Sequence, residues 1–249
     1  TTEITEQSGS LNLEGKAELE YASGYYFTKL ILNNTTALNA VVDLASVHSI
    51  LMQSSLPDDI TTEKSYIKEV SSDGVRELEQ TISGLGGEVK ELSLCKTKKA
   101  ALGSIVLDNF TFTVLDTLKT SQGKKIDAII GLDILSMCSE LQIIIPNDKD
   151  KGMLVFKKTP GNEKALIRIP YTINHGHIFV KGKVGNSVID FIVDTGSPFN
   201  ILTSKTAKKE NIKTEDFISV HGADGNKLKS KKGTADKITL GDMQFQNTE

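Results

Sequence analysis

The most restrictive feature of this 249-residue sequence is an internal repeat. The stretch VVDLASVHSIL at 41–51 aligns with IVDTGSPFNIL at 192–202, an offset of 151 residues. A second pair of stretches, ISGLGG at 82–87 and VHGADG at 220–225, aligns at the shorter offset of 138, so the first copy has a longer intervening loop. Because a repeated sequence indicates repeated structural units, the chain is predicted to form two related lobes in tandem.

Short β-rich segments dominate both copies. YYFTKLIL, FTFTVLD and HIFVKGKV are examples, and Gly, Asn, Asp and Ser separate such segments. Long helical periodicity is nearly absent, and Thr-Pro-Gly-Asn at 159–162 interrupts the pattern in the middle of the chain. The sequence therefore predicts an all-β fold with lobe one at 15–158 and lobe two at 166–249.

Composition excludes several classes of protein. With 38% apolar and 24% charged residues the chain is globular, and a formal charge of −3 is too small for a dedicated nucleic-acid binder. No apolar run approaches the roughly 18 residues that predict a membrane-spanning helix. Two cysteines cannot form a disulfide framework or a four-cysteine zinc site, and we predict no metal. A polar start at Thr1 favours a secreted or periplasmic protein that has lost a leader, although a trimmed chain would look the same.

Each copy of the repeat contains an apolar strand that runs directly into an aspartate, Asp43 or Asp194. Small residues follow both, and such turns offer backbone N–H groups to a carboxylate. A pseudo-twofold axis between the lobes would bring the two carboxylates together, where they would share one proton. One aspartate could then activate water while the other protonates or polarises a carbonyl group.

These motifs resemble those of the retropepsin-like aspartic peptidases, the family of retroviral proteases and single-lobe relatives of pepsin. Asp194-Thr195-Gly196-Ser197 matches the family's Asp-Thr-Gly motif. The glycine-rich stretch at 82–90 resembles its flap, and Ile-Ile-Gly-Leu-Asp-Ile-Leu at 129–135 resembles the strand and helix that support the active-site loop. The resemblance implies two acid-protease β-barrel lobes related by a pseudo-twofold axis.

The resemblance also implies the functional residues. Asp194 and Asp43 would be catalytic, and an extended polypeptide substrate would bind as a strand without any cofactor. The implied substrate-binding residues belong to the second Asp loop, to the flap and to the flap's lobe-two counterpart at 222–227: Thr195, Gly196, Ser197, Gly84, Leu85, Gly86, Gly87, Gly222, Ala223 and Asp224. Ser46 and Ser197 are expected to donate hydrogen bonds to the adjacent carboxylates, which would favour an acidic pH optimum.

Two departures from the family's pattern raise alternatives. Leu44 replaces the threonine whose hydroxyl ties the two loops together, and Ala45 replaces the glycine. Lobe two lacks counterparts of the last strands of lobe one, so we expect a truncated lobe that a further roughly 45 residues, or a second polypeptide, would stabilise. The protein is accordingly predicted to be an endopeptidase that pairs its own lobes as a monomer. The alternatives are a peptide-binding module without catalysis and a homodimer that pairs lobe two with lobe two.

Overall fold

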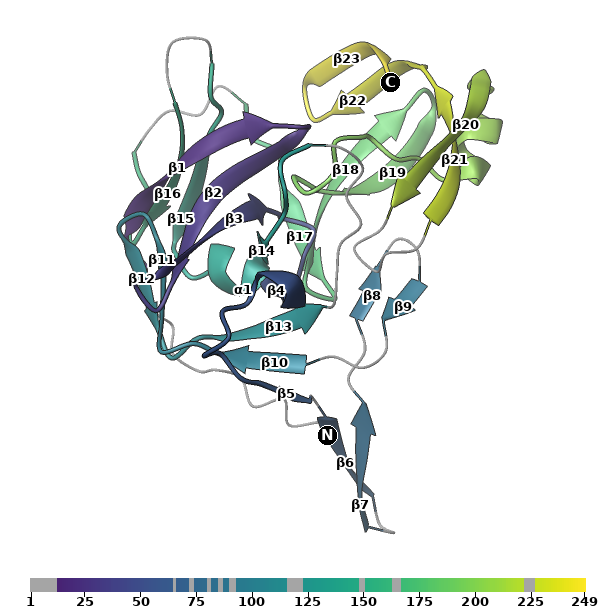
Figure 1. Ribbon diagram of the computed structural model, residues 1–249. Helices are drawn as coiled ribbons and strands as arrows, with labels where there is room; N and C mark the ends of the chain where they lie inside the picture. Colours follow the sequence, from purple (N-terminus) through teal and green to yellow (C-terminus); the bar gives the residue numbers. More distant parts are fainter. Residues whose placement is uncertain are drawn as a thin grey trace.

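The computed structural model describes residues 13–64, 66–71, 74–79, 82–84, 87–89, 93–115, 123–147, 151–162, 167–221 and 227–249. These residues are mostly in β-strands (Figure 1), as the sequence predicts. No described helix has the length and apolar character needed to cross a membrane.

Lobe one is built on a 12-stranded sheet with the order β15-β16-β1-β2-β3-β14-β4-β13-β10-β5, to which β11 and β12 are added beside β2. Its strands alternate buried and more exposed side chains, as in β12 and β16, because one face of each strand covers the core. The bounds of the strands are β1 Gly15–Ala22, β2 Tyr25–Leu32, β3 Thr36–Val42, β4 Ile50–Met52, β5 Thr62–Lys64, β10 Ser93–Lys96, β11 Lys99–Leu102, β12 Ile105–Asp108, β13 Thr111–Leu115, β14 Ala128–Ile130, β15 Glu140–Ile144 and β16 Gly152–Lys157.

The placement of β14 fixes the loop that contains Asp43. This strand runs parallel to β3, with Ile130 opposite Val42, and it also pairs antiparallel with β4. The loop from Asp43 to Ser49 therefore leaves one neighbour of β14 and returns along the other. The helix α1, Leu132–Leu135, follows β14 directly, and its first N–H groups donate to the carbonyl oxygens of Ser46 and Val47. The predicted support of this loop by residues 129–135 is confirmed.

The core of lobe one consists of two apolar clusters, which lie on opposite faces of strands β3 and β14. The larger of its two buried clusters includes Leu30, Val42, Leu51, Phe112 and Ile130, all close to fully buried. A smaller cluster contains Phe27, Val41, Ile50, Met52, Leu115, Ile126 and Ile129. Because buried apolar surface stabilises a fold by about 25 cal/mol per Å², these two clusters make a large hydrophobic contribution to the stability of lobe one.

The described residues also form three two-stranded hairpins, separate from the larger sheets, and a short 3-10 turn. The 3-10 turn follows β4. The hairpins β6–β7 and β8–β9 come between β5 and β10 in the chain and extend away from the lobe-one sheet (Figure 1), whereas β20–β21 belongs to lobe two. Their bounds are 3-10 turn Gln53–Ser55, β6 Tyr66–Ser71, β7 Gly74–Glu79, β8 Ile82–Gly84, β9 Gly87–Val89, β20 Thr214–His221 and β21 Lys227–Gly233.

Lobe two contains a five-stranded sheet with the order β17-β18-β22-β23 and with β19 also paired to β18. The strands are β17 Tyr171–Asn174, β18 His177–Val184, β19 Ser187–Ile192, β22 Ala235–Leu240 and β23 Met243–Thr248, and α2 spans Ser204–Lys209. Within 167–215 and 229–249, the parts of lobe two whose burial is described, the buried apolar residues are Val184 and Ala235.

One face of this sheet is apolar and partly uncovered. Cross-strand register places Tyr171 and Ile173 on the same face as Val180 and Phe191, and Tyr171 and Ile173 are 62% and 68% exposed. Ile189, Phe191 and Val193, from β19 and the residues that follow it, are half-buried. In lobe one, β13, β14 and α1 supply the apolar residues that cover the corresponding strands.

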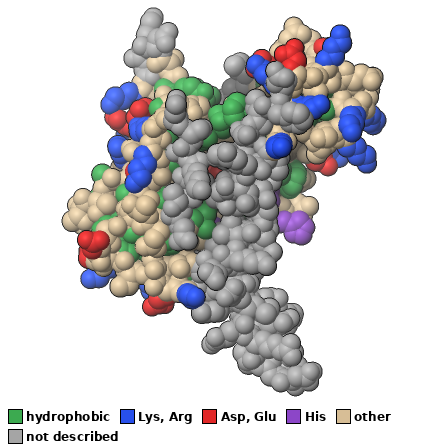
Figure 2. Space-filling view, turned by 45° about the vertical axis from the view of Figure 1, so that its right-hand side comes forward, with side chains coloured by type: hydrophobic (Ala, Val, Ile, Leu, Met, Phe, Trp, Pro, Cys, Tyr) green, Lys and Arg blue, Asp and Glu red, His purple; other side chains and the backbone are tan. Residues whose placement is uncertain are grey.

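Lysine side chains give lobe two a basic surface. Lysine side chains gather on the upper right of the molecule in Figure 2, where lobe two lies. The exposed lysines of this region are Lys205, Lys208, Lys209, Lys213, Lys229, Lys231 and Lys232.

Ser49, at the end of the Asp43 loop, is hydrogen-bonded to Gly131 and Asp133 in the segment that supports this loop. Its hydroxyl accepts a hydrogen bond from Gly131 N–H at 2.9 Å and donates to the Asp133 carboxylate at 2.5 Å, while its N–H donates to the other carboxylate oxygen at 2.7 Å. The residue is fully buried. These bonds have no water to replace them if the hydroxyl is removed.

We therefore predict that Ser49→Ala lowers the free energy of unfolding by about 2 kcal/mol, because it leaves a buried N–H and a carboxylate oxygen without that partner. Ser104→Ala makes the same chemical change at an exposed hydroxyl that bonds Lys16 N–H, and it should cost no more than about 0.5 kcal/mol. Urea unfolding of both variants tests the difference. Equal losses would show that Ser49 does not hold the loop.

Candidate active site

The two predicted aspartates each sit at the start of a tight loop of the same geometry. In lobe one, Oδ1 of Asp43 accepts hydrogen bonds from the N–H groups of Ala45 at 2.8 Å and Ser46 at 3.1 Å. In lobe two, Oδ1 of Asp194 accepts one from Gly196 N–H at 2.7 Å. The strand before each loop ends one or two residues earlier, so the carboxylates follow directly from the sheets.

Thr195 connects the two loops across the lobes. Its hydroxyl donates to the carbonyl oxygen of Val42 at 2.8 Å and accepts from Leu44 N–H at 3.1 Å. At the equivalent position in lobe one, Leu44 has no hydroxyl, and its side chain packs against the core of lobe one instead. The side-chain hydrogen bonding between the two Asp loops is therefore one-sided, because it comes from the Thr195 hydroxyl of lobe two and has no counterpart at Leu44.

Gly196 allows the close approach of the two carboxylates. A Cβ atom added at this position would overlap the carboxylate of Asp43, so no residue other than glycine fits without displacing it. Asp194 is close enough to Asp43 for its charge to raise the pKa of the Asp43 carboxyl. The structure thus brings together the two residues that the repeat singles out.

The environment of Asp43 favours its protonated form. Burial and, to a smaller extent, the negative charge of Asp194 raise the pKa of Asp43, the N–H groups of Ala45 and Ser46 oppose them, and together these effects set the pKa at about 6. Asp194 itself is exposed. Asp43 is thus the member of the pair that holds a proton more readily than an ordinary aspartate.

The expectation that the two serines donate to the carboxylates is wrong. The hydroxyl of Ser46 donates to the carbonyl oxygen of His48 at 2.7 Å, and that of Ser197 donates to the carbonyl oxygen of Phe199 at 2.9 Å. Backbone N–H groups already occupy the inner oxygen of each aspartate, so the hydroxyls turn away and close the next turn of each loop. The repetition of this bond in both lobes supports the pseudo-twofold relation of the loops.

The predicted flap is described in part. β8 and β9 form an antiparallel hairpin in which Gly84 pairs with Gly87, and β20 and β21 form the lobe-two hairpin. Both hairpins lie on the same side of the molecule in Figure 1. The tips, which include the predicted binding residues Leu85, Gly86, Gly222, Ala223 and Asp224, lie outside the described residues.

Sequence reasoning missed one residue beside the pair, Tyr25. This half-buried tyrosine has its pKa raised by burial and by the charge of Asp194. The spacing of the β2–β3 hairpin could have revealed it, because residues equally far from a hairpin turn lie opposite each other. The structure adds no sign of a metal site, since the described side chains include no group of three or more His, Cys, Asp or Glu that could hold an ion.

Comparison with known proteins agrees with this geometry. Residues 180–249 match the family model for aspartyl protease. Conglutin gamma, a basic 7S globulin from lupine seeds, superposes with a TM-score of 0.53 at 12% identity, covering 94% of this chain and 81% of that chain. An aspartic proteinase from Irpex lacteus gives 0.48 at 14% identity over 94% of this chain and 78% of that chain.

Basic 7S globulin from soybean gives a TM-score of 0.47 at 14% identity, and the match covers 76% of this chain and 65% of the length of the globulin. A search of curated proteins finds no match. The predicted all-β acid-protease fold is confirmed, and so is the resemblance to the retropepsin-like aspartic peptidases.

The raised pKa of Asp43 predicts a pH dependence of stability. A folded-state pKa above the unfolded value means that the folded protein holds this proton more tightly, so the contribution of Asp43 is most favourable below about pH 4 and is lost as pH rises to about 6. Asp43→Asn keeps the oxygen that accepts the two N–H groups but removes the charge. It should raise the free energy of unfolding at pH 7 by about 1–3 kcal/mol and have little effect at pH 4. Urea unfolding at both pH values measures this, and a loss of stability at pH 7 would contradict it.

Proposed function

We propose that the protein is an aspartic-type endopeptidase that hydrolyses extended polypeptides with Asp43 and Asp194 as its catalytic pair. The observation that carries the proposal is the cross-lobe arrangement in which Thr195 bonds Val42 and Leu44 while Gly196 lies against the carboxylate of Asp43. The family match over residues 180–249 supports the class of chemistry.

The environments of the two aspartates suggest their roles. Asp43 is the more buried, with a pKa of about 6, so below that pH it holds the shared proton and donates a hydrogen bond to the substrate carbonyl. Asp194 accepts a proton from the attacking water as general base. The water oxygen bonds to the carbonyl carbon, and the tetrahedral intermediate collapses as a proton passes to the departing amide nitrogen. No cofactor is required.

The substrate would bind as an extended strand between the aspartates and the two hairpins. The β8–β9 and β20–β21 hairpins would cover it, and main-chain hydrogen bonds from a flap provide affinity without strict sequence preference. Thr195, Gly196 and Ser197 border the pair from lobe two, and Gly84 and Gly87 begin and end the turn of the flap.

A second candidate function is peptide binding without hydrolysis. The packing of Leu44 against the core of lobe one favours it, because the loops are then tied by one hydroxyl instead of two. The fold alone does not decide, since it is shared with a seed globulin.

Isosteric substitution tests the pair directly. Asp194→Asn and Asp43→Asn should each reduce kcat for a peptide substrate by at least about a thousandfold, because either change removes the shared proton and its acceptor. If lobe two instead works as a homodimer, only Asp194→Asn abolishes turnover, and specific activity falls on dilution. If the protein only binds peptides, the wild type cleaves none, while a statine-type peptide still binds.

Restoring the family's Asp-Thr-Gly motif in lobe one tests whether the missing hydroxyl at Leu44 limits the rate of hydrolysis. Leu44→Thr combined with Ala45→Gly should raise kcat at constant KM, by about tenfold, because a second cross-lobe hydrogen bond holds the loops more firmly. Activity peaking below about pH 6 is expected for both forms, since the shared proton leaves as pH rises through the pKa of Asp43. An unchanged or lower rate in the double variant would contradict the role given to Leu44.

A further inference from the structure

The first hairpin of each lobe ends in the same kind of turn. The β1–β2 hairpin of lobe one turns through Ser23 and Gly24, whose φ values are +55 and +88. The β17–β18 hairpin of lobe two turns through His175 and Gly176, with φ values of +48 and +78. Two consecutive positive φ values are typical of two-residue hairpin turns, and glycine adopts them without steric cost. The two lobes therefore have the same turn at equivalent places in their sheets.

Each of these glycines lies against the Asp loop of the opposite lobe. A Cβ atom added at Gly24 would lie 2.5 Å from Cβ of Pro198 in lobe two. One added at Gly176 would lie 3.1 Å from both Cγ atoms of Val47 in lobe one. Val47 and Pro198 each follow the serine of their Asp motif, so they are equivalent in the two copies of the repeat. Unlike the bonds of the Thr195 hydroxyl, these contacts are made from both lobes.

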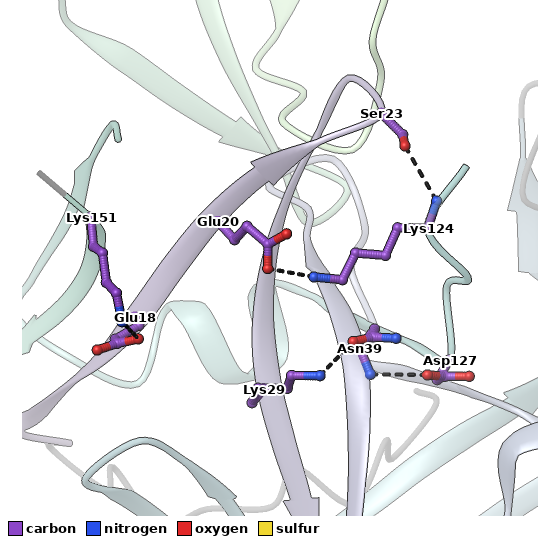
Figure 3. Close-up of polar contacts among 8 residues, drawn as sticks. All are labelled: Glu18, Glu20, Ser23, Lys29, Asn39, Lys124, Asp127 and Lys151. Atoms are coloured by element: carbon purple, nitrogen blue, oxygen red, sulfur yellow. Dashed lines mark hydrogen bonds and ion pairs between the residues drawn. The ribbon is translucent and has the colours of Figure 1, made fainter. Parts of the chain in front are cut away.

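The turn of lobe one is held to its own lobe from behind. The hydroxyl of Ser23 accepts a hydrogen bond from Lys124 N–H at 3.3 Å, and Nζ of Lys124 lies 2.5 Å from Oε2 of Glu20 (Figure 3). Gly123 packs closely against the same turn, because a Cβ atom added there would lie 2.5 Å from Oγ of Ser23. A side chain added to the turn would therefore displace the loop of lobe two.

Movement of either loop would move its aspartate. Pro198 is four residues after Asp194, and Val47 is four residues after Asp43. Within each loop the carboxylate accepts hydrogen bonds from backbone N–H groups two or three residues further on. Because these bonds tie the carboxylate to its loop, displacing a loop changes the separation of the two carboxylates.

We propose that Gly24 and Gly176 are positioning residues: each lobe's glycine turn holds the Asp loop of the other lobe and so sets the separation of the two aspartates. The contacts themselves do not depend on catalysis, whereas their effect on turnover rests on the proposed function. They give the site a reciprocal hold between the lobes, which the hydroxyl of Thr195 provides from one side only.

Gly24→Ala tests the contact, because its methyl group would overlap Cβ of Pro198. Pro198→Gly removes that Cβ atom, whereas Pro198→Ala keeps it, so only Pro198→Gly should relieve the effect of Gly24→Ala. Gly241→Ala is the matched control for backbone strain. Gly241 lies in the β22–β23 turn with φ +55, and a Cβ atom added there would make an ordinary contact at 3.4 Å within its own lobe.

Two quantities are measured in each variant. The first is the pH midpoint of the Asp43 carboxyl, followed by ¹³C NMR, which does not require activity. The second is the pair kcat and KM on a peptide substrate. In Gly24→Ala the Asp43 midpoint should fall below about 6, because the lobe-two loop moves away and water reaches the carboxylate. The value of kcat should fall about tenfold and KM should stay within about twofold. Gly241→Ala should change neither quantity.

The combined variants show whether the effect comes from the contact. Gly24→Ala with Pro198→Gly should match Pro198→Gly alone within about threefold in kcat, whereas Gly24→Ala with Pro198→Ala should keep the full loss. Gly176→Ala is the milder variant, because its overlap is shallower. It should lower kcat by about threefold, and Val47→Ala should remove that effect.

The outcomes separate the inference from the proposed function. If the wild type cleaves no peptide, the proposed function is wrong, and the Asp43 midpoints alone decide the role of the two glycines. An Asp43 midpoint that is the same in Gly24→Ala and Gly241→Ala would overturn the inference. Equal losses on adding Gly24→Ala to Pro198→Gly and to Pro198→Ala would also overturn it.

Discussion

One hydroxyl group, that of Thr195, is the interaction on which the candidate site depends. It bonds the backbone on both sides of Asp43, at Val42 and at Leu44, and so fixes the position of the lobe-two loop against the lobe-one loop. The close contact of Gly196 with Asp43 is possible only in this position. Two carboxylates would otherwise move apart, because like charges repel and each is better solvated alone.

Lobe one supplies the rigid side of this contact. The loop from Asp43 to Ser49 is held from below by β14, α1 and the buried bonds of Ser49, so its backbone groups are already in place for Thr195. Lobe two has few buried side chains of its own, and its sheet keeps an apolar face partly exposed. The orientation of Asp194 consequently depends more on contacts with lobe one than on the packing of its own lobe. This dependence explains why the absence of a hydroxyl at Leu44 matters.

The two-lobe fold and the pairing of the two aspartates could be predicted from the sequence, because the repeat is a local pattern that can be recognised in the amino-acid sequence itself. An apolar strand that ends in Asp, twice and at similar spacing, predicts the meeting of Asp43 and Asp194, and Ile-Ile-Gly predicts the strand that supports their loop. The serine bonds were predicted wrongly because a hydroxyl and a backbone N–H compete for the same carboxylate oxygen, and only the local backbone path decides between them. Tyr25 was missed because no motif marks it, although counting back from the β2–β3 turn would have placed it near Asp43; its response to the charge of Asp194 depends on how the lobes meet.

The most direct test of the central claim is the pKa of Asp43, measured by ¹³C NMR of its carboxyl carbon in the wild type, in Thr195→Ser and in Thr195→Val. Serine keeps the bridging hydroxyl, whereas valine has the same shape as threonine without it. If this hydroxyl holds the carboxylates together, Asp43 titrates near pH 6 in the wild type and in Thr195→Ser, and at a clearly lower pH in Thr195→Val, where the loops separate and water reaches the carboxylate. An Asp43 titration near pH 6 in Thr195→Val would contradict the account.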